Sequence, residues 1–449
     1  MARSYKLVNI VVPSVSSGTS SGVMTLVGTN TQNSLIAANP SRFGSAGTQD
    51  GLPIQTYQLG YAINGAYGSG TFVPGYRAKG CWMVAAASGD TAPRIIDAVL
   101  FDFNSLTWEL QVNAHGIKNH LSADHCADAQ YGTVTESWAE PWDGDLRAGG
   151  TKYEYLNYPG VPKPSQQYRG TVGVGDKYII TAGAYPSAGG LGTQKESHVY
   201  DPNTRRYSQF SANGITSAIE PRFDWMKEAV ALYDATANRI WLVSYEIWST
   251  TKQLYLDLND NTWKAATIPP GPYCGDTGNW HHALLHVDST RRCILRFAND
   301  QANNNWVFVL DLTNIGAGWR PCTLSGSLAN FGRRTYIQAF GVRWAQYPTA
   351  DGGDNCHYST DGYSGVITKI TPPASGITGT WTISNVTPAS IVNGNGANYP
   401  LAFPPARAGG GTAEGGSTLP HCTRFFYVPA LTCFAWVAGG DQPVALWKP

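Results

Sequence analysis

One short segment of the chain gathers side chains that can bind a metal. Imidazole and thiolate groups are the ligands that zinc and copper prefer. Four of them form an H-x4-H-x4-H-C group, with Asp124 and Asp128 nearby: His115, His120, His125 and Cys126. The spacing fits no established metal module, and a polar segment of this kind is ordinarily solvated. We therefore predict no bound metal and no cofactor.

Two motifs that organise common enzyme sites are absent from the sequence. No G-x-S-x-G elbow is present to hold a catalytic serine. The glycine-rich stretch Ala408-Gly-Gly-Gly-Thr412 lacks the lysine and the helix of a phosphate-binding loop. We predict that the chain is not an enzyme.

A dense group of aromatic residues is the candidate contact surface. Large rings with a polar group are enriched in protein interfaces and sugar-binding surfaces. The group lies within residues 114–168 and comprises Trp138, Trp142, Tyr153, Tyr155 and Tyr158. The alternative is that these rings form a small local core.

The composition indicates that a β-sheet protein positions these side chains. The 449 residues include 50 Gly, 15 Trp and 24 Tyr, and charged residues make up only 14%. Frequent turns and aromatic strand residues are typical of all-β proteins. The 8 cysteines are scattered without a C-x-x-C pair, which favours small buried side chains over a disulfide framework.

Charge and hydropathy narrow the range of partners. The 31 basic and 31 acidic residues cancel, so the chain lacks the electrostatic footprint of a general nucleic-acid binder. No apolar run reaches the length of about 18 residues that predicts a membrane span. The run Leu7-Val-Asn-Ile-Val-Val-Pro13 is too short and interrupted for a signal peptide. We expect synthesis in the cytoplasm, no nucleic acid partner and no membrane insertion.

An internal repeat organises the sequence. Asp102-Phe-Asn-Ser-Leu-Thr-Trp108 has a near copy in Asp257-Leu-Asn-Asp-Asn-Thr-Trp263, and related units occupy residues 201–207 and 311–319. An Asp ends one strand, small polar residues reverse the chain, and an aromatic residue opens the next strand. The ring can then fill the gap between neighbouring sheets. A second hairpin lies upstream of each unit, most clearly at residues 227–245.

Two hairpins in each repeat predict the four-stranded blade of a β-propeller. The matching aromatic residues are Trp108, Tyr207, Trp263, Trp319, Trp381 and Trp447. They predict one propeller of six blades over residues 71–449, and a seven-bladed ring is the alternative if the Gly/Ser/Thr-rich extension at residues 14–70 contains a blade. The wide interval between Trp108 and Tyr207 predicts an insertion at about residues 114–168.

The two ends of the chain predict how the ring closes. Residues 423–428, 433–438 and 443–447 supply only three strands of the last blade before the chain stops. Residues 5–12, within an N-terminal segment 1–13, form a strand without a partner. We expect this N-terminal strand to complete the last blade, which removes the open edges.

The units Asp201-Pro-Asn-Thr-Arg-Arg-Tyr207 and Ala182-Gly183 resemble the repeats of kelch and galactose-oxidase-type propellers. The resemblance covers roughly residues 70–449 and implies the kelch-like propeller fold. It departs from the family in lacking a regular Gly-Gly pair after each second strand. The closing stretch, residues 421–447, is similar to propellers encoded by bacteriophages and prophages.

The resemblance to copper-radical oxidases of this fold implies one further site. Such an oxidase needs a Tyr–Cys crosslink, a second Tyr and two His around copper. The histidines available for it are His281, His282, His357 and His421. No matching local motif surrounds them, so the oxidase is the least favoured alternative. Trp280-His281-His282 is placed near the rim of the central channel, where packing between blades is the simpler role.

The expected function is that of a non-enzymatic structural or binding propeller. The phage resemblance implies a tail-associated or capsid-associated virion protein, made in the host cytoplasm, that contacts other virion proteins within a homo- or hetero-oligomeric assembly. The insertion and the extension at residues 14–70 are expected to make the contacts, since long excursions from a rigid scaffold usually do. The alternative is a propeller that binds a host surface glycan.

Overall fold

The computed structural model describes the parts of the chain that form its sheets. These are residues 20–43, 70–88, 94–116, 133–134, 152–153, 161–162, 167, 170–181, 184–187, 190–193, 197–210, 229–243, 253–271, 284–299, 305–326, 344–360, 367–401, 425–437 and 442–449. The protein is all-β, as predicted, and is built from four-stranded antiparallel units. Among these residues, no helix combines the length and hydropathy needed to cross a membrane.

Three units come from the first part of the chain, each with its strands paired in sequence order. Unit 1 comprises β2 (Thr71–Val73), β3 (Cys81–Val84), β6 (Ala98–Asp102) and β7 (Thr107–Gln111). Unit 2 comprises β10 (Thr171–Val174), β11 (Lys177–Ile180), β14 (Ser197–Asp201) and β15 (Arg206–Phe210). Unit 3 comprises β16 (Val230–Asp234), β17 (Arg239–Val243), β18 (Gln253–Asp257) and β19 (Thr262–Ala266).

Three more units follow. Unit 4 comprises β20 (Leu284–Asp288), β21 (Cys293–Asn299), β22 (Asn305–Asp311) and β23 (Trp319–Ser325). Unit 5 comprises β24 (Ala345–Gln346), β25 (His357–Thr360), β26 (Ile367–Thr371) and β27 (Thr380–Val386). Unit 6 comprises β29 (Phe425–Val428), β30 (Cys433–Val437), β31 (Val444–Trp447) and the N-terminal strand β1 (Val23–Val27).

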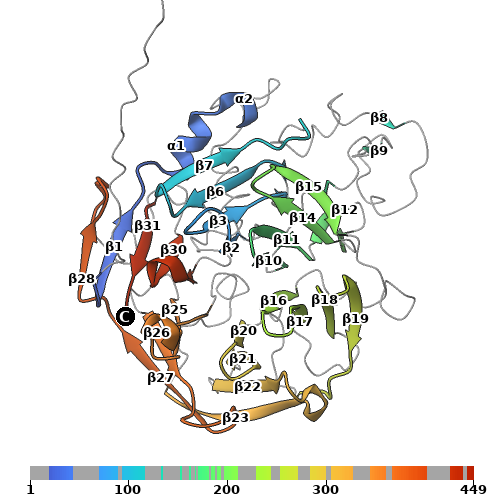
Figure 1. Ribbon diagram of the computed structural model, residues 1–449, viewed down its shortest axis with the longest axis vertical. Helices are drawn as coiled ribbons and strands as arrows, with labels where there is room; N and C mark the ends of the chain where they lie inside the picture. Colours follow the sequence, from blue (N-terminus) through green and yellow to red (C-terminus); the bar gives the residue numbers. More distant parts are fainter. Residues whose placement is uncertain are drawn as a thin grey trace, which may run out of the picture.

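Figure 1 shows these units side by side around a common centre, with units 1 and 6 adjacent. The first strands of successive units contact one another from β2 to β10, from β10 to β16 and from β16 to β20, and β24 contacts β29. Six hydrophobic clusters are each shared by two neighbouring units, and one of them joins unit 6 to unit 1. The core therefore lies between the sheets.

The repeated aromatic residues pack where the sequence predicts. In units 1 to 5 they lie in the fourth strand and are at most 5% exposed. Tyr207 packs in a cluster with unit 1, Trp263 with unit 2 and Trp319 with unit 3. Trp447 differs, because it lies in the third strand of unit 6, opposite Met24 of β1. It is therefore not the equivalent of the other five rings.

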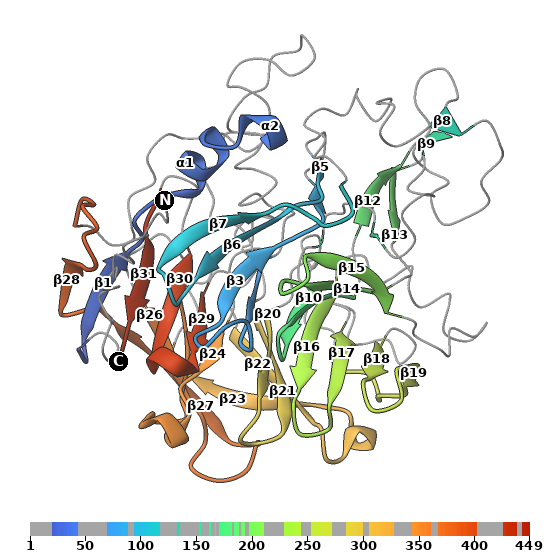
Figure 2. The same ribbon diagram turned by 45° about the horizontal axis from the view of Figure 1, so that its top comes forward.

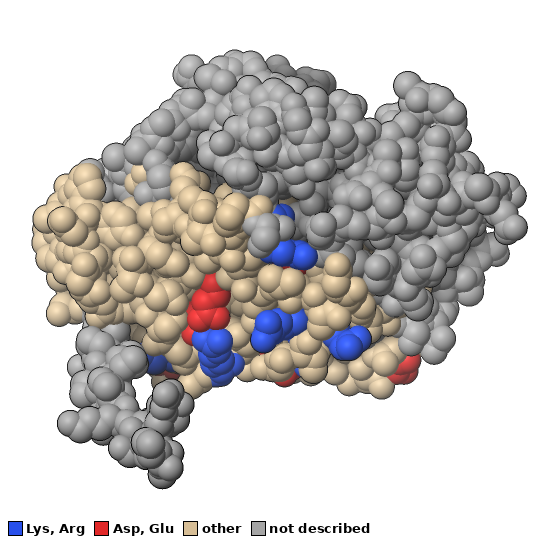
Figure 3. Space-filling view, turned by 90° about the horizontal axis from the view of Figure 1, so that it is seen from above, with Lys and Arg blue, Asp and Glu red and all other residues tan. Residues whose placement is uncertain are grey.

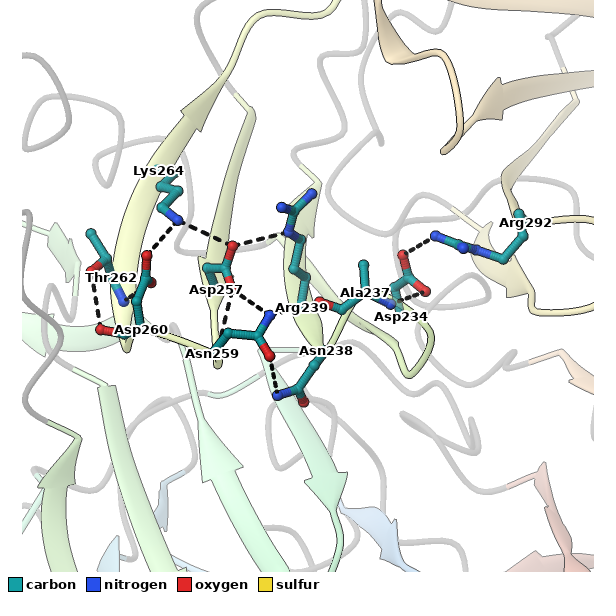
Figure 4. Close-up of polar contacts among 10 residues, drawn as sticks. All are labelled: Asp234, Ala237, Asn238, Arg239, Asp257, Asn259, Asp260, Thr262, Lys264 and Arg292. Carbon is teal, nitrogen blue, oxygen red and sulfur yellow. Dashed lines mark hydrogen bonds and ion pairs between the residues drawn. The ribbon is translucent and has the colours of Figure 1, made fainter.

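The Asp of each repeat ends its strand, as predicted, and also caps the turn that follows. The Asp102, Asp201, Asp257 and Asp311 Oδ1 atoms each accept the backbone N–H two residues ahead, over 2.8–3.2 Å. Figure 4 shows these contacts at one end of unit 3, where Lys264 and Arg239 also reach Asp257. Figure 3 shows basic and acidic side chains interspersed on one face of the molecule.

The strand that completes unit 6 is not the one that the sequence predicts. β1 pairs antiparallel with β31, with Thr25 opposite Leu446. The predicted strand at residues 5–12 lies outside the described part of the chain. In the described part of the chain, β31 has β1 on one side and β30 on the other. Residues 23–27 therefore provide the fourth strand of unit 6.

The outer strands of units 4, 5 and 6 are linked to one another. β23 pairs in parallel with β27, which joins units 4 and 5 into an eight-stranded sheet. After β27 the chain forms β28 (Ser390–Asn393), which pairs in parallel with β1 of unit 6.

Two short helices, α1 (Gln32–Ala37) and α2 (Pro40–Phe43), follow β1, and α1 contacts β7 of unit 1. Two small hairpins add further strands to the fold. One pairs β4 (Ala87–Ser88) with β5 (Arg94–Ile95), and the other pairs β12 (Ala184–Ser187) with β13 (Gly190–Thr193).

Candidate functional site

The predicted contact surface falls on the insertion between units 1 and 2. Trp138, Trp142, Tyr155 and Tyr158 lie outside the described residues. Tyr153 belongs to β9 (Lys152–Tyr153), which pairs with β8 (Thr133–Val134), and only its backbone is described. The structure therefore describes none of the five side chains. What it does describe is the base from which the insertion leaves and to which it returns.

The outgoing end of the insertion is fixed by Gln111, the last residue of β7. Its Nε2 donates to Tyr76 Oη over 2.9 Å and to the Pro202 carbonyl over 3.1 Å. Its Oε1 accepts the hydroxyl of Tyr200 over 3.1 Å. Gln111 is 7% exposed and Tyr200 is fully buried. Since a buried amide without partners is costly, this pattern holds units 1 and 2 in one relative position.

Asp97 fixes the chain just after β7, through hydrogen bonds from Asn113 and an ion pair with Arg42. The backbone N–H and the side-chain amide of Asn113 donate to Asp97 Oδ1 over 2.8 and 2.7 Å. Arg42 of α2 binds both oxygens of Asp97 through Nε and one terminal nitrogen, each over 2.7 Å. Such bidentate, charge-assisted contacts are the stronger class of ion pair. The N-terminal helices are thereby tied to the start of the insertion.

His115 is the one member of the H-x4-H-x4-H-C group that the structure describes. Its Nε2 accepts the backbone N–H of Tyr207 over 2.9 Å, and its ring stacks on the Tyr207 ring. Burial, together with the charge of Arg206, lowers the pKa of His115. The imidazole is therefore neutral and has one nitrogen already engaged. His120, His125 and Cys126 lie outside the described residues, which contain no cluster of three or more His, Cys, Asp or Glu that could hold a metal.

The returning end of the insertion is fixed by Gln167. This side chain is fully buried and donates to the carbonyls of Ala85 and Ala86 over 2.6 and 2.9 Å. Its Oε1 accepts the Tyr178 hydroxyl over 2.7 Å. Gln111 and Gln167 thus anchor the two ends of the insertion on the same pair of units. Sequence reasoning missed both, because a lone Gln carries no signal until its partners are known.

A second polar cluster lies between units 4 and 5. His357 Nε2 is 3.0 Å from Asp288 Oδ2, and the ring of His286 lies edge-on to that of His357. Gln346 and the backbone N–H of Arg291 donate to Asp288 Oδ1 over 3.2 and 2.8 Å. Burial raises the pKa of Asp288, but the hydrogen bond and charge of His357 outweigh it, so the pKa lies below its usual range.

A His, an Asp and a neighbouring thiol are the parts of a nucleophilic site, but here they are enclosed. Cys293 lies directly opposite Asp288 in the β20–β21 pair. Burial raises the pKa of Cys293 far above its usual value, so the thiol stays protonated. Asp288 and His357 have no exposed side-chain surface. A substrate cannot reach them in this structure, and their contacts hold two units together. Of the other oxidase candidates, His281, His282 and His421 lie outside the described residues.

Comparisons with known proteins give no family assignment. No protein-family model matches the chain, and no curated protein sequence does. Among solved structures, a putative 6-phosphogluconolactonase from Bacteroides uniformis is 10% identical, with a TM-score of 0.31, over 71% of this chain and 84% of that one. TolB from Acinetobacter baumannii is 11% identical, with a TM-score of 0.25, over 96% and 94% of the two chains. Scores this low carry no argument about fold or function.

Proposed function

We propose that the chain is a single six-bladed, kelch-like β-propeller whose last blade is completed by β1. The six four-stranded units and the six clusters between neighbours support this interpretation. In particular, cluster members from unit 6, such as Val428 and Leu446, pack with Trp82 and Phe101 of unit 1. A row of sheets would leave these two faces uncovered.

The two ends of the blades differ, and this difference supports a binding role. Because the strands of a blade alternate in direction, the connections within its two hairpins lie at one end, the turn end. In unit 3 these are residues 235–238 and 258–261. The connections from second to third strand and from blade to blade start at the opposite end, the loop end. In unit 3 these are residues 244–252 and 267–283.

Contacts between neighbouring blades place the turn ends on one side. Gly75 donates to the Gly175 carbonyl over 2.8 Å between units 1 and 2. Arg292 pairs with Asp234 over 3.0 Å between units 4 and 3. The insertion therefore leaves from the loop end, and long loops on a rigid scaffold are the usual place for specific contacts.

We propose that the chain is a non-enzymatic scaffold that binds protein partners through the insertion at residues 114–168. The single observation that carries this is the anchoring of both ends of the insertion by Gln111 and Gln167. A recognition segment held at both ends loses less entropy on binding than a free one. On the resemblance of residues 421–447 to phage propellers, the partners are other proteins of a virion.

Cross-linking mass spectrometry of the assembly purified from its native source tests this function. Lys118, Lys152 and Lys163 belong to the insertion, whereas Lys177 and Lys264 lie at the turn end and serve as matched controls. We expect cross-links to other virion proteins from the insertion lysines and few or none from the control lysines. A chain that remains an isolated monomer, or that cross-links mainly through its turn end, would overturn the proposal.

A further inference from the structure

β28 is an edge strand with an open side. It pairs with β1 through four residue pairs, from Val23 with Ser390 to Leu26 with Asn393. Figures 1 and 2 both place it outermost beside β1. No other strand in the described parts of the chain pairs with it. Open edges of this kind are a template for a further strand, and proteins ordinarily cover them.

The segment around β28 also exposes apolar side chains. Val392 is 40% exposed and Leu401 is 58% exposed, and these are the large hydrophobic residues found exposed within the described residues. The segment is nonetheless well fixed. Asn393 and Tyr399 exchange two hydrogen bonds, of 2.9 and 3.2 Å, and the Tyr399 hydroxyl donates to the Gly28 carbonyl over 3.1 Å. The edge is therefore held in a defined shape, and among the described residues its outer side pairs with no strand.

The described part of the chain starts beside the first residues of β28. The described chain begins at Ser20, and the Gly22 carbonyl accepts the backbone N–H of Ala389, the residue before β28, over 2.7 Å. Residues 5–12 precede it and read Tyr-Lys-Leu-Val-Asn-Ile-Val-Val. Residues 20–22 are fixed beside β1, since Gly22 donates to the Lys448 carbonyl over 2.8 Å, so the joining segment is the seven residues 13–19, with three Ser and one Gly. At up to about 3.3 Å per residue, they can reach across one strand and turn back.

We propose that residues 5–12 pair with the outer side of β28 of the same chain, as a further strand of the sheet of unit 6. Alternate residues then present Val8, Ile10 and Val12 to one face of the sheet, beside the apolar side chains of its neighbours. Attachment next to β28 gives the segment an effective concentration in the millimolar range, which favours pairing within one chain over pairing between copies. The added strand covers the open edge and its exposed Val392.

Hydrogen exchange of the full-length chain tests the proposal. We expect the amides of residues 5–12 to exchange at least about tenfold more slowly than those of an unstructured peptide, independently of protein concentration. Ile10→Pro removes a donor within the new strand. It should abolish this protection and speed exchange at residues 390–393. Ser16→Pro in the joining segment is the matched control and should change neither region.

Three outcomes decide the matter. Loss of protection at both segments in Ile10→Pro, with exchange in β30 unchanged, supports the pairing. Unprotected amides at residues 5–12 in the unaltered chain overturn it. Protection that appears only as concentration rises, together with a dimer in sedimentation analysis, also overturns it, because the strand then pairs with a second copy.

Discussion

The imidazole of His357 and the carboxylate of Asp288 lie 3.0 Å apart, fully buried, across the boundary between units 4 and 5. Asp288 ends the first strand of unit 4, and His357 begins the second strand of unit 5. Residues that are 69 positions apart in sequence are thus joined at the centre of a sheet-to-sheet contact. A His–Asp pair is a common part of catalytic sites, but here the contact between Asp288 and His357 connects the sheets of units 4 and 5.

Asp288→Asn should weaken this contact. Removing one partner of a buried ion pair typically costs about 3–5 kcal/mol in the free energy of unfolding. Since the folded-state pKa of Asp288 is lowered, its contribution is present above the pKa of an unfolded Asp, near about 4, and is lost as the pH falls toward the folded-state value. The difference in the free energy of unfolding between the unaltered chain and Asp288→Asn should therefore be largest at neutral pH and decrease in acid. Denaturant unfolding at several pH values measures this difference in the free energy of unfolding, and an equal difference at every pH contradicts the assignment.

Trp263→Ala should open a cavity between units 2 and 3. The Trp263 side chain is 1% exposed and packs against Ile179 and Leu254 of the two sheets. Loss of a buried Trp typically costs about 3–5 kcal/mol. Trp263→Tyr should cost less, because Tyr207 fills the equivalent position in unit 2. Thermal unfolding of the two variants checks this order, and equal losses would show that a tyrosine ring cannot fill this position.

Gly173→Ala should separate the first strands of units 1 and 2. A Cβ atom at Gly173 would lie 2.0 Å from the backbone carbonyl oxygen of Phe72, so the two strands must move apart. Overpacking of this kind typically costs about 1–3 kcal/mol. Gly316 is the control, because its nearest neighbour would be 3.8 Å away. Chemical denaturation should show a clear loss for Gly173→Ala and little change for Gly316→Ala; similar values for both would contradict the close approach.

Trp138→Ala combined with Trp142→Ala should remove partner binding without unfolding the sheets. On the proposed function these rings belong to the contact surface, whereas the anchors Gln111 and Gln167 belong to the base. We expect binding to the virion partner to fall by at least about tenfold, since aromatic anchors dominate interface energies, with the melting temperature unchanged. Binding that survives the double substitution would exclude these rings from the interface. Binding to a glycan array that depends on them would favour the host-glycan alternative.

The local rules of the repeat are predictable from sequence. Asp257 caps its turn and Trp263 fills a gap between sheets because both effects depend on residues within one hairpin and on the burial of a large ring. Contacts between distant segments are not predictable in this way. Both residues 5–12 and residues 23–27 have the composition of a strand, and which of them pairs with β31 is settled only by the packing of Met24 and Leu26 against units 5 and 6.

The candidate site likewise has one feature that the sequence predicts and others that it does not. The position of the insertion follows from the interval between Trp108 and Tyr207. Its anchors do not, because Gln167 is defined by the carbonyls of Ala85 and Ala86, far upstream in the sequence. The Asp288–His357 contact was missed for the same reason. Asp288 occupies the turn position that Asp234 occupies in unit 3, but no sequence pattern indicates that a His from the next unit will meet it.

The pairing of β1 with β31, by which an N-terminal strand completes unit 6, is the central claim, and a pair of cysteines tests it most directly. Thr25 and Leu446 are register partners in the β1–β31 pair, and neighbouring antiparallel strands place such residues within disulfide range. The account predicts that Thr25→Cys combined with Leu446→Cys forms an intramolecular disulfide under mild oxidation, seen by peptide mapping, while Asn9→Cys combined with Leu446→Cys does not. A bridge from position 9 and none from position 25 would contradict the account.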